Sequence, residues 1–210
     1  MRSSNPRDSS SHCLTCYMRR PVCICPILPQ VKTKTEFVIL RHIWEAERPS
    51  NTGRLVALTM PNARIAPCGG GTRIGLAPLD ETLLQEPGTC LLWPDGPAVK
   101  TDAPDFIPPK HVVVLDATWH QARRLFRQTP ALRSLPRLAL PVPEKHRDRL
   151  RDQHRPDGMS TIEAVAAAVT LLEGHHVAEP LERLYDEVVR RTTSLRWGTK
   201  SACLLDVQAI

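Results

Sequence analysis

The feature that most constrains the fold is a run of four apolar residues, 112–115, that ends directly in Asp116. A short run rich in β-branched residues, without polar alternation, is typical of a strand buried on both faces of a parallel sheet. The spacing of Ala122, Leu125 and Phe126 then predicts a helix. Asp116 is therefore expected at the carboxyl end of a central strand, which is the edge of an open α/β sheet where ligands bind.

Two interpretations of Asp116 follow from this placement. A carboxylate between a strand and a helix can be a helix N-cap, a role that Thr118 would share. Capping does not explain Trp119, a large aromatic ring directly past the cap. The alternative is a functional carboxylate at the ligand-binding edge of the sheet.

Four cysteines near the N-terminus form the strongest metal-binding pattern. Cys13 and Cys16 are three positions apart, and Cys23 and Cys25 are two apart. Four thiolates so close in sequence can close a tetrahedral site, for which Zn²⁺ is the usual ion, and such a closed site is structural rather than catalytic. Redox-active or merely structural thiols are the alternative. Seven cysteines in a chain that starts without an apolar secretory segment indicate reduced thiols and predict a cytoplasmic protein.

A second polar block precedes a predicted helix. Residues 36–41 indicate the first strand, and residues 55–60 indicate a helix. Asn51 or Ser50 can cap that helix, which is the structural interpretation of this block. The functional interpretation uses Gly53, because a glycine at a helix start lets a ligand approach the backbone N–H groups closely.

Basic residues are unevenly distributed along the chain, whose net charge is +6. Arg41, Arg48 and Arg54 surround the polar block and could hold a phosphate or a carboxylate in a fork. Between positions 120 and 155, ten Lys or Arg residues face three Asp or Glu residues. Such local asymmetry favours a nucleic-acid partner, with an ordinary solvated helix face as the alternative.

Ser160 opens the clearest predicted helix. Ile162, Val165 and Val169 fall on one face of it. Ser160 and Glu163 form a capping box, which accounts for both residues without any function. A final amphipathic helix is predicted over residues 179–191.

These patterns predict an α/β fold with a mainly parallel sheet flanked by helices. The strands are expected near residues 37–41, 64–67, 89–93, 111–115 and 137–140. A length of 210 residues suits one domain with a small appendage. We expect a disordered, Ser-rich N-terminus over residues 1–12, a small zinc-binding element over 13–30 and the α/β domain over 31–210.

Asp116, Thr118 and Trp119 form an Asp-x-Thr-Trp motif that, with the following His-Gln-Ala-Arg, resembles the signature of the DTW-domain family. Three other stretches resemble the family: the four cysteines, residues 41–54 and residues 160–164. Ala117 is a mild departure, since glycine is common there. The resemblance implies a tRNA-uridine aminocarboxypropyltransferase that binds S-adenosylmethionine. It also implies a SPOUT-like α/β fold with a C-terminal trefoil knot, a rare threaded topology.

The motifs and the resemblance together assign the candidate site residues. The expected catalytic residues are Asp116 and Trp119. The expected S-adenosylmethionine-binding residues are Leu92, Pro94, Asp116, Thr118, Ser160, Thr161 and Glu163. The expected RNA-binding residues are Arg41, His42, Arg48, Asn51, Thr52, Arg54, His120, Arg123, Arg124 and Arg127. The expected zinc ligands are Cys13, Cys16, Cys23 and Cys25.

The reaction implied by the resemblance moves the 3-amino-3-carboxypropyl group of S-adenosylmethionine to N3 of a uridine and releases methylthioadenosine. A sulfonium already carries a good leaving group, so positioning supplies much of the catalysis. Asp116 is the expected base for the N3 proton, with His120 as a second candidate. Trp119 could stack on the uracil or hold the sulfonium by a cation–π contact.

Two alternatives stay open at this point. One is an S-adenosylmethionine-dependent RNA methyltransferase, and the other is a zinc-bearing RNA-binding protein without activity. The resemblance implies tRNA as the partner, and no DNA partner is expected. No membrane partner is expected either, because no apolar run approaches the ~20 residues of a membrane span. A monomeric protein is compatible with the sequence.

Overall fold

The computed structural model of the chain describes residues 10–69, 79–95, 104–141, 148, 150 and 158–197. Its centre is a five-stranded sheet in which every pairing is parallel and the strand order is β2-β1-β4-β3-β5. The strands are β1 (Glu36–His42), β2 (Ala63–Cys68), β3 (Thr89–Leu92), β4 (His111–Asp116) and β5 (Arg137–Leu138). All five predicted strands are therefore confirmed, and so is the α/β class.

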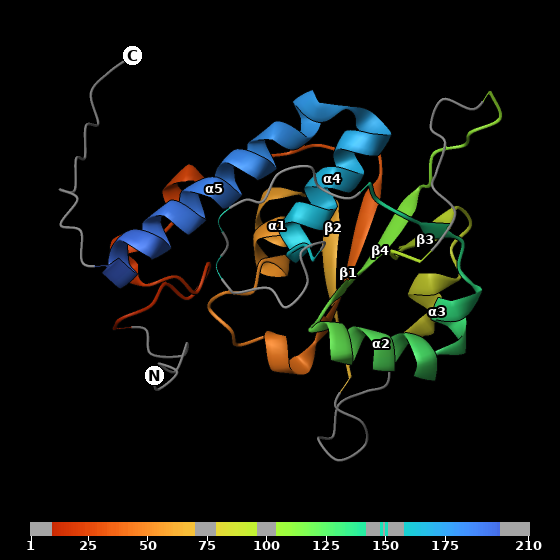
Figure 1. The fold of residues 1–210 in the computed structure, drawn as a ribbon, viewed down its shortest axis with the longest axis horizontal. Helices are drawn as coiled ribbons and strands as arrows, with labels where there is room; N and C mark the ends of the chain where they lie inside the picture. The colour runs from red at the N-terminus through yellow and green to blue at the C-terminus, as the bar shows by residue number, and fades with distance from the viewer. Residues whose placement is uncertain are drawn as a thin grey trace.

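Helices cover both faces of this sheet (Figure 1). The helices α1 (Gly53–Thr59), α4 (Thr161–Glu173) and α5 (His175–Trp197) pack on one face, and α2 (Trp119–Gln128) and α3 (Pro130–Ser134) pack on the other. Short 3₁₀ turns complete the described structure: η1 (Arg20–Val22), η2 (Cys25–Ile27), η3 (Ile43–Glu45) and η5 (Glu81–Leu84). The final helix begins four residues earlier than predicted, directly after Gly174, whose positive φ of 99° breaks the chain from α4.

Successive side chains of the central strands point to opposite faces of the sheet, and both faces are covered by helices. This explains why the apolar runs contain no polar residues. Phe37 and Ile39 of β1 pack with α1, α4 and α5, whereas Val38 and Leu40 pack with α2 and α3. All four side chains have no exposed surface. A strand covered on both faces buries every side chain, which is what the sequence predicted for the strand that ends in Asp116.

The helix caps differ from the sequence interpretation at one important position. Thr118, not Asp116, is the N-cap of α2, and it forms a capping box with Gln121. Asp116 is the last residue of β4, so the capping interpretation of this carboxylate is wrong. The predicted capping box of Ser160 and Glu163 at the start of α4 is confirmed. Thr52 is the N-cap residue of α1, but its side chain makes no capping hydrogen bond. Oδ1 of Asn51 accepts a hydrogen bond of 3.0 Å from the N–H of Arg54 instead, so the predicted capping role of Asn51 is confirmed at the level of this hydrogen bond.

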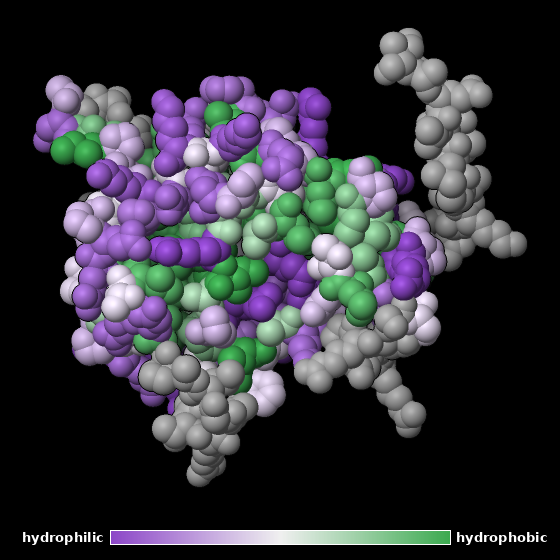
Figure 2. Space-filling view, turned by 180° about the vertical axis from the view of Figure 1, so that it is seen from behind, coloured by the Kyte–Doolittle hydropathy of each residue, from purple (hydrophilic) through white to green (hydrophobic). Residues whose placement is uncertain are grey.

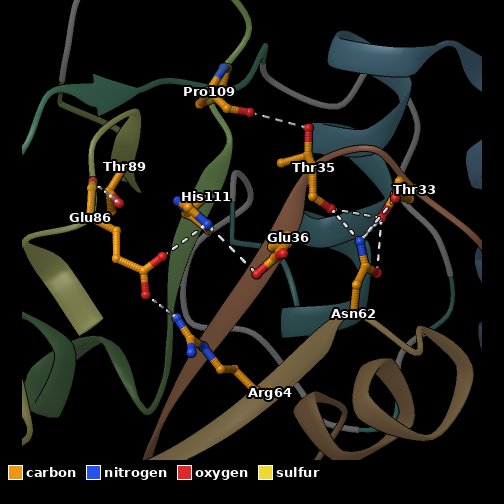
Figure 3. Close-up of polar contacts among 9 residues, drawn as sticks. All are labelled: Thr33, Thr35, Glu36, Asn62, Arg64, Glu86, Thr89, Pro109 and His111. Carbon is orange, nitrogen blue, oxygen red and sulfur yellow. Dashed lines mark hydrogen bonds and ion pairs between the residues drawn. The ribbon is translucent and has the colours of Figure 1, made fainter. Parts of the chain in front are cut away.

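The amino edge of the sheet carries a network of polar contacts (Figure 3). Nε2 of His111 lies 3.1 Å from a carboxylate oxygen of Glu86 and 3.7 Å from one of Glu36. Glu86 also accepts a hydrogen bond of 2.8 Å from Arg64 on β2. These contacts link the starts of three neighbouring strands, so they lie at the edge opposite to Asp116.

The N-terminal segment packs against the main core rather than standing apart. Cys16, Met18, Val22 and Ile24 are buried in the same cluster as residues of α4 and α5. The predicted disorder over residues 1–12 falls mostly on 1–9, which lie outside the described residues, while His12 is buried and bridges Arg19.

The outer surface is mixed in character. Seen from behind, hydrophilic residues dominate the upper part of the molecule and apolar residues come to the surface across its middle (Figure 2). Within the described segments, no helix combines the length and apolar character needed to cross a membrane.

Candidate functional site

Asp116 lies at the centre of a polar cluster at the carboxyl edge of the sheet. It shares a face of β4 with Val112 and Val114, the face that α1 and α4 cover, and only 4% of its surface is exposed. Its two oxygens each accept one hydrogen bond of 2.6 Å, one from Nδ2 of Asn51 and one from the hydroxyl of Thr161. The carboxylate is therefore fixed in orientation by two different segments of the chain.

Burial raises the pKa of the Asp116 carboxyl above its ordinary value. The hydrogen bonds from Asn51 and Thr161 act in the opposite direction, since they stabilise the charged form, but burial outweighs them. The negative charge of Glu45 adds to the rise, while Arg41 opposes it. The result is a carboxylate that is more basic than usual, as a general base at neutral pH requires.

Gly53 provides the space that Asp116 occupies. A Cβ atom at position 53 would lie 2.4 Å from Oδ2 of Asp116 and 2.6 Å from its Cγ, which no real side chain allows. The sequence suggested that Gly53 admits a ligand to the backbone. In the structure the close approach is made by a side chain of the protein itself.

Three predicted motifs converge at this point. The block around Asn51 and Gly53 meets the end of β4, and the start of α4 supplies Thr161. The backbone N–H of Ile162 also points to the hydroxyl of Thr52, at 3.4 Å. Residues far apart in the sequence thus build one site, which is the arrangement expected at the carboxyl edge of parallel strands.

A row of aromatic rings lies beside this cluster on the other face of the sheet. Trp93, which directly follows β3, makes an edge contact with Trp119 at a centroid distance of 6.3 Å. Trp93 also stacks on Phe126 at 4.6 Å. Trp119 is partly exposed at the first position of α2, so this end of the row reaches the surface. Leu92 is half-buried and Pro94 exposed on either side of Trp93.

The three arginines of the polar block have different environments. Arg41 pairs in register with Asp116, and its buried Nε has no hydrogen-bond partner within the described segments. Arg48 is exposed and forms an ion pair of 3.3 Å with the buried Glu45. Arg54 is buried, and its guanidinium donates to the backbone oxygens of Ala46 and Arg48.

Arg54 therefore acts inside the protein, where it links the polar block to the cysteine loop. The ring of Tyr17 covers the Arg54 guanidinium at 3.7 Å, and burial lowers the pKa of Arg54 to about 10. Asn51 and Thr52 are also buried. From the sequence these residues are expected to bind RNA, and their burial is not predicted. The covering ring of Tyr17 comes from a segment 37 positions earlier, which local patterns do not relate to Arg54.

The expected RNA contacts on α2 are exposed. Side chains on the outer side of this helix are open to solvent, namely His120, Arg123, Arg124 and Arg127. Thr118 is exposed as well, while His42 is half-buried at the end of β1. Burial lowers the pKa of His42; the charge of Glu45 opposes this shift, and the nearby charge of Arg124 adds to it. The basic helix thus lies next to the carboxyl edge that holds Asp116.

The four N-terminal cysteines come together. Their Sγ atoms all lie within 4.8 Å of one another, with Cys13 and Cys25 at 3.6 Å and Cys16 and Cys23 at 3.7 Å. Four thiolates around one Zn²⁺ at a Zn–S distance of about 2.3 Å would be spaced by roughly 3.8 Å. All four cysteines are free, so the donor set fits a tetrahedral metal ion.

The cysteine loop is tied to the rest of the molecule on two sides. Tyr17, held in a left-handed conformation with φ of 61°, reaches Arg54 as described. Arg191 of α5 donates a hydrogen bond of 2.7 Å to the backbone oxygen of Cys23. Sequence reasoning missed Tyr17 and Trp93. The aromatic residue directly after the Cys-x-x-Cys pair was the available signal for Tyr17.

Comparison with known proteins places the chain among related sequences. The model of the DTW domain matches residues 10–193. The chain is 26% identical to tRNA-uridine aminocarboxypropyltransferase 2 of Macaca fascicularis, over 85% of this chain and 62% of that protein. It is 28% identical to the protein of the same name from Drosophila melanogaster, over 81% and 70%. It is also 28% identical to tRNA-uridine aminocarboxypropyltransferase A of Arabidopsis thaliana, over 55% and 50%.

These relatives are longer than the region they share with this chain, which spans between half and about two thirds of their lengths. No solved structure matches the chain.

Proposed function

This chain belongs to the DTW domain family, and we propose from this premise that it is a tRNA-uridine aminocarboxypropyltransferase. The observation that carries the proposal is the buried Asp116, held by Asn51 and Thr161 beside an exposed basic helix. The reaction needs a base for the N3 proton and a surface that binds RNA beside it, and the candidates for both lie at the same edge of the sheet. The names of the relatives, matched over most of this chain, support the same conclusion.

The proposed chemistry is a displacement at carbon. S-adenosylmethionine, as co-substrate, supplies a sulfonium-activated 3-amino-3-carboxypropyl group. N3 of uridine forms a bond to the γ-carbon, the bond from that carbon to sulfur breaks, and methylthioadenosine leaves with the electron pair. The N3 proton must also leave, and we assign its acceptance to the carboxylate of Asp116. The rigid hydrogen bonds from Asn51 and Thr161 would aim that carboxylate, which supports a role in positioning.

We propose that Trp119 is the second catalytic residue, stacked on the uracil or on the sulfonium. Its partial exposure beside the Trp93 ring supports this role. The co-substrate pocket is assigned to residues at the ends of β3 and β4 and the start of α4: Leu92, Pro94, Thr118, Ser160, Thr161 and Glu163. Asn51, Thr52 and Arg54 are expected from sequence to bind RNA. Their burial supports a structural role instead, in which they hold the residues of the site in place.

The basic face of α2 yields a prediction about RNA affinity. Reversing the charges of Arg123, Arg124 and Arg127 together should weaken tRNA binding and flatten its dependence on salt. With fewer phosphate contacts, binding releases fewer counterions from the RNA. Binding would be measured as a function of salt concentration. Reversal of Arg183, an exposed arginine on α5, is the matched control. An unchanged salt slope in the triple variant would place the RNA-binding face elsewhere, with Arg19 and Arg20 next to test.

The cysteine cluster yields a prediction about metal. Protein purified under reducing, chelator-free conditions should carry about one Zn²⁺ per chain, bound by Cys13, Cys16, Cys23 and Cys25. Elemental analysis checks this, with Cys23→Ser expected to lose the metal and the buried, isolated Cys90→Ser expected to keep it. Because the metal would hold the loop that carries Tyr17, Cys23→Ser should destabilise the N-terminal region. A metal-free parent protein would contradict the assignment.

The finer architecture is also proposed. We infer a SPOUT-like fold with a C-terminal trefoil knot. The stretch that leads into α4 is only partly described, since residues 142–147 and 151–157 lie outside the described residues. The proposed division is a zinc-binding element over 13–30 and the α/β domain over 31–210. A cytoplasmic location is proposed as well, and the clustering of four thiols in a geometry that suits a metal ion supports it.

One experiment separates the proposed activity from its alternatives. Unmodified tRNA is incubated with the protein and S-adenosylmethionine, and its nucleosides are analysed by mass spectrometry. A uridine heavier by the aminocarboxypropyl group supports the proposal. A uridine heavier by a methyl group identifies a methyltransferase instead. An unchanged tRNA that nevertheless binds the protein tightly identifies a non-catalytic, zinc-bearing RNA-binding protein.

A further inference from the structure

An exposed tryptophan stands at the same edge of the sheet as Asp116. Trp44 is 60% exposed, although tryptophan side chains are mostly buried in folded proteins. It lies in η3, the short 3₁₀ turn that directly follows β1. Three positions before it, Arg41 pairs in register with Asp116. Trp44 thus lies within the stretch 41–54, yet it is not among the residues assigned to the candidate site.

The backbone around Trp44 is held by hydrogen bonds, while more than half of the residue's surface is exposed. The N–H of Trp44 donates to Nδ1 of His42 at 3.3 Å, and the N–H of Ala46 donates to the oxygen of Ile43 at 3.1 Å. The next residue, Glu45, is buried and pairs with Arg48 at 3.3 Å. An anchored turn of this kind presents an aromatic ring to solvent at a small cost in entropy, which suits a binding contact.

The basic face of α2, which lies near Trp44, favours a polyanionic partner. The charge of Arg124 on α2 acts on His42, whose ring accepts a hydrogen bond from the N–H of Trp44. Arg48 is exposed four positions after Trp44, where it pairs with Glu45. Figure 1 shows the orange turn after β1 beside the first part of α2, which carries the basic face. The same segment holds two acidic residues: Glu45, which is buried, and Glu47, which is exposed. A protein-docking face would instead need apolar neighbours, and the exposed residues beside Trp44 in the chain are charged.

We propose that Trp44 stacks on a nucleobase of the tRNA next to the target uridine. An exposed aromatic ring beside a basic surface is a usual platform for an unpaired base, because the cations bind the backbone and the ring binds the base. A uridine whose N3 is to react cannot be base-paired, so its neighbours must also be accessible. This inference rests on the proposed function, since it assigns a second contact for the same substrate.

The test compares tRNA binding by Trp44→Ala, Trp44→Phe and Ile107→Ala with binding by the parent. Ile107 is 86% exposed and precedes β4, so it is a matched apolar side chain at the opposite edge of the sheet. Trp44→Ala should weaken binding by about 10-fold or more, as the loss of one base–aromatic stack does. Trp44→Phe should keep most of the affinity, and Ile107→Ala should equal the parent.

Salt dependence supplies a second readout. Stacking involves no counterion release, so Trp44→Ala should lower the affinity without changing the slope against salt, unlike reversal of the α2 arginines. Equal binding by Trp44→Ala and Ile107→Ala would overturn the inference and point to a protein partner for this ring. If the parent binds tRNA without modifying it, the proposed activity fails while Trp44 can still pass this test. If the parent does not bind tRNA, both fall together.

Discussion

Replacing Asp116 with asparagine should reduce turnover by roughly 10²-fold or more, while the fold and the affinity for tRNA survive. The substitution keeps the shape of the side chain and removes its basicity. Without a carboxylate at this position, the N3 proton of uridine has no acceptor that the protein holds in place. Single-turnover transfer to tRNA, measured beside tRNA binding and thermal unfolding, checks the three parts of this expectation.

The structure explains why stability should survive. In Asp116→Asn the amide oxygen can still accept the hydrogen bond from Asn51, and the amide nitrogen can donate to the hydroxyl of Thr161, which is able to accept. Burial raises the pKa of Asp116, so the ionised carboxylate costs the folded state stability once the pH exceeds its unfolded-state value. Because asparagine removes that cost, the variant should be at least as stable as the parent at neutral pH.

The pH dependence follows from the same shift. A base must be ionised to act, so turnover of the parent should rise with pH through the raised pKa of Asp116, and Asp116→Asn should lack that rise. Asp80→Asn is the control, because Asp80 is an exposed carboxylate that caps a short turn far from the site in the chain. Near-normal turnover with intact binding in Asp116→Asn would leave His120 or solvent as the proton acceptor. A parallel loss of S-adenosylmethionine affinity would make Asp116 a co-substrate contact.

Gly53→Ala should abolish most activity through one added methyl group. The new Cβ would meet Oδ2 of Asp116 at 2.4 Å, so the carboxylate must move away from Asn51. We expect a loss of turnover comparable to that of Asp116→Asn. We also expect destabilisation by about 1–3 kcal/mol, the usual cost of overpacking a buried site. Activity assays and denaturant unfolding measure the two effects.

The sign of the stability change makes this prediction specific. Alanine is a better helix former than glycine, so Gly53→Ala would ordinarily stabilise α1. Ala57→Gly in the same helix is the matched control, expected to lose about 1 kcal/mol of stability without loss of turnover. A Gly53→Ala variant with parental activity would show that Asp116 tolerates displacement, and the tight contact would then have no catalytic meaning.

The strands were predictable because each is a short apolar run bounded by polar or turn residues. The prediction for β5 was too long by two residues, since Ala139 and Leu140 lie beyond the last pairing partner that β3 offers. The strand order was not predictable from periodicity. It depends on how each crossover passes over the sheet, and no local pattern encodes that path.

The site was predictable where residues lie next to one another in sequence, and less so where they meet across the fold. Asp116 and Thr161 were both singled out, yet nothing in the chain predicted the 2.6 Å hydrogen bond between them. The local pattern predicted Asp116 as a helix cap because an Asp between a strand and a helix commonly caps the helix. In the structure Thr118, two residues later, caps α2, and the Asp116 carboxylate is buried instead.

The strand order has a consequence for the way the chain folds. β4 lies between β1 and β3, so neither neighbour completes its pairing until position 116 has been synthesised. Thr161 comes later still, and contacts across such sequence separations slow folding. During synthesis the already formed β1–β2 pair would have a bare apolar edge, which is prone to aggregate. Truncation at a site between β2 and β4 should therefore give an insoluble fragment, and chaperone dependence should concentrate in that interval of elongation.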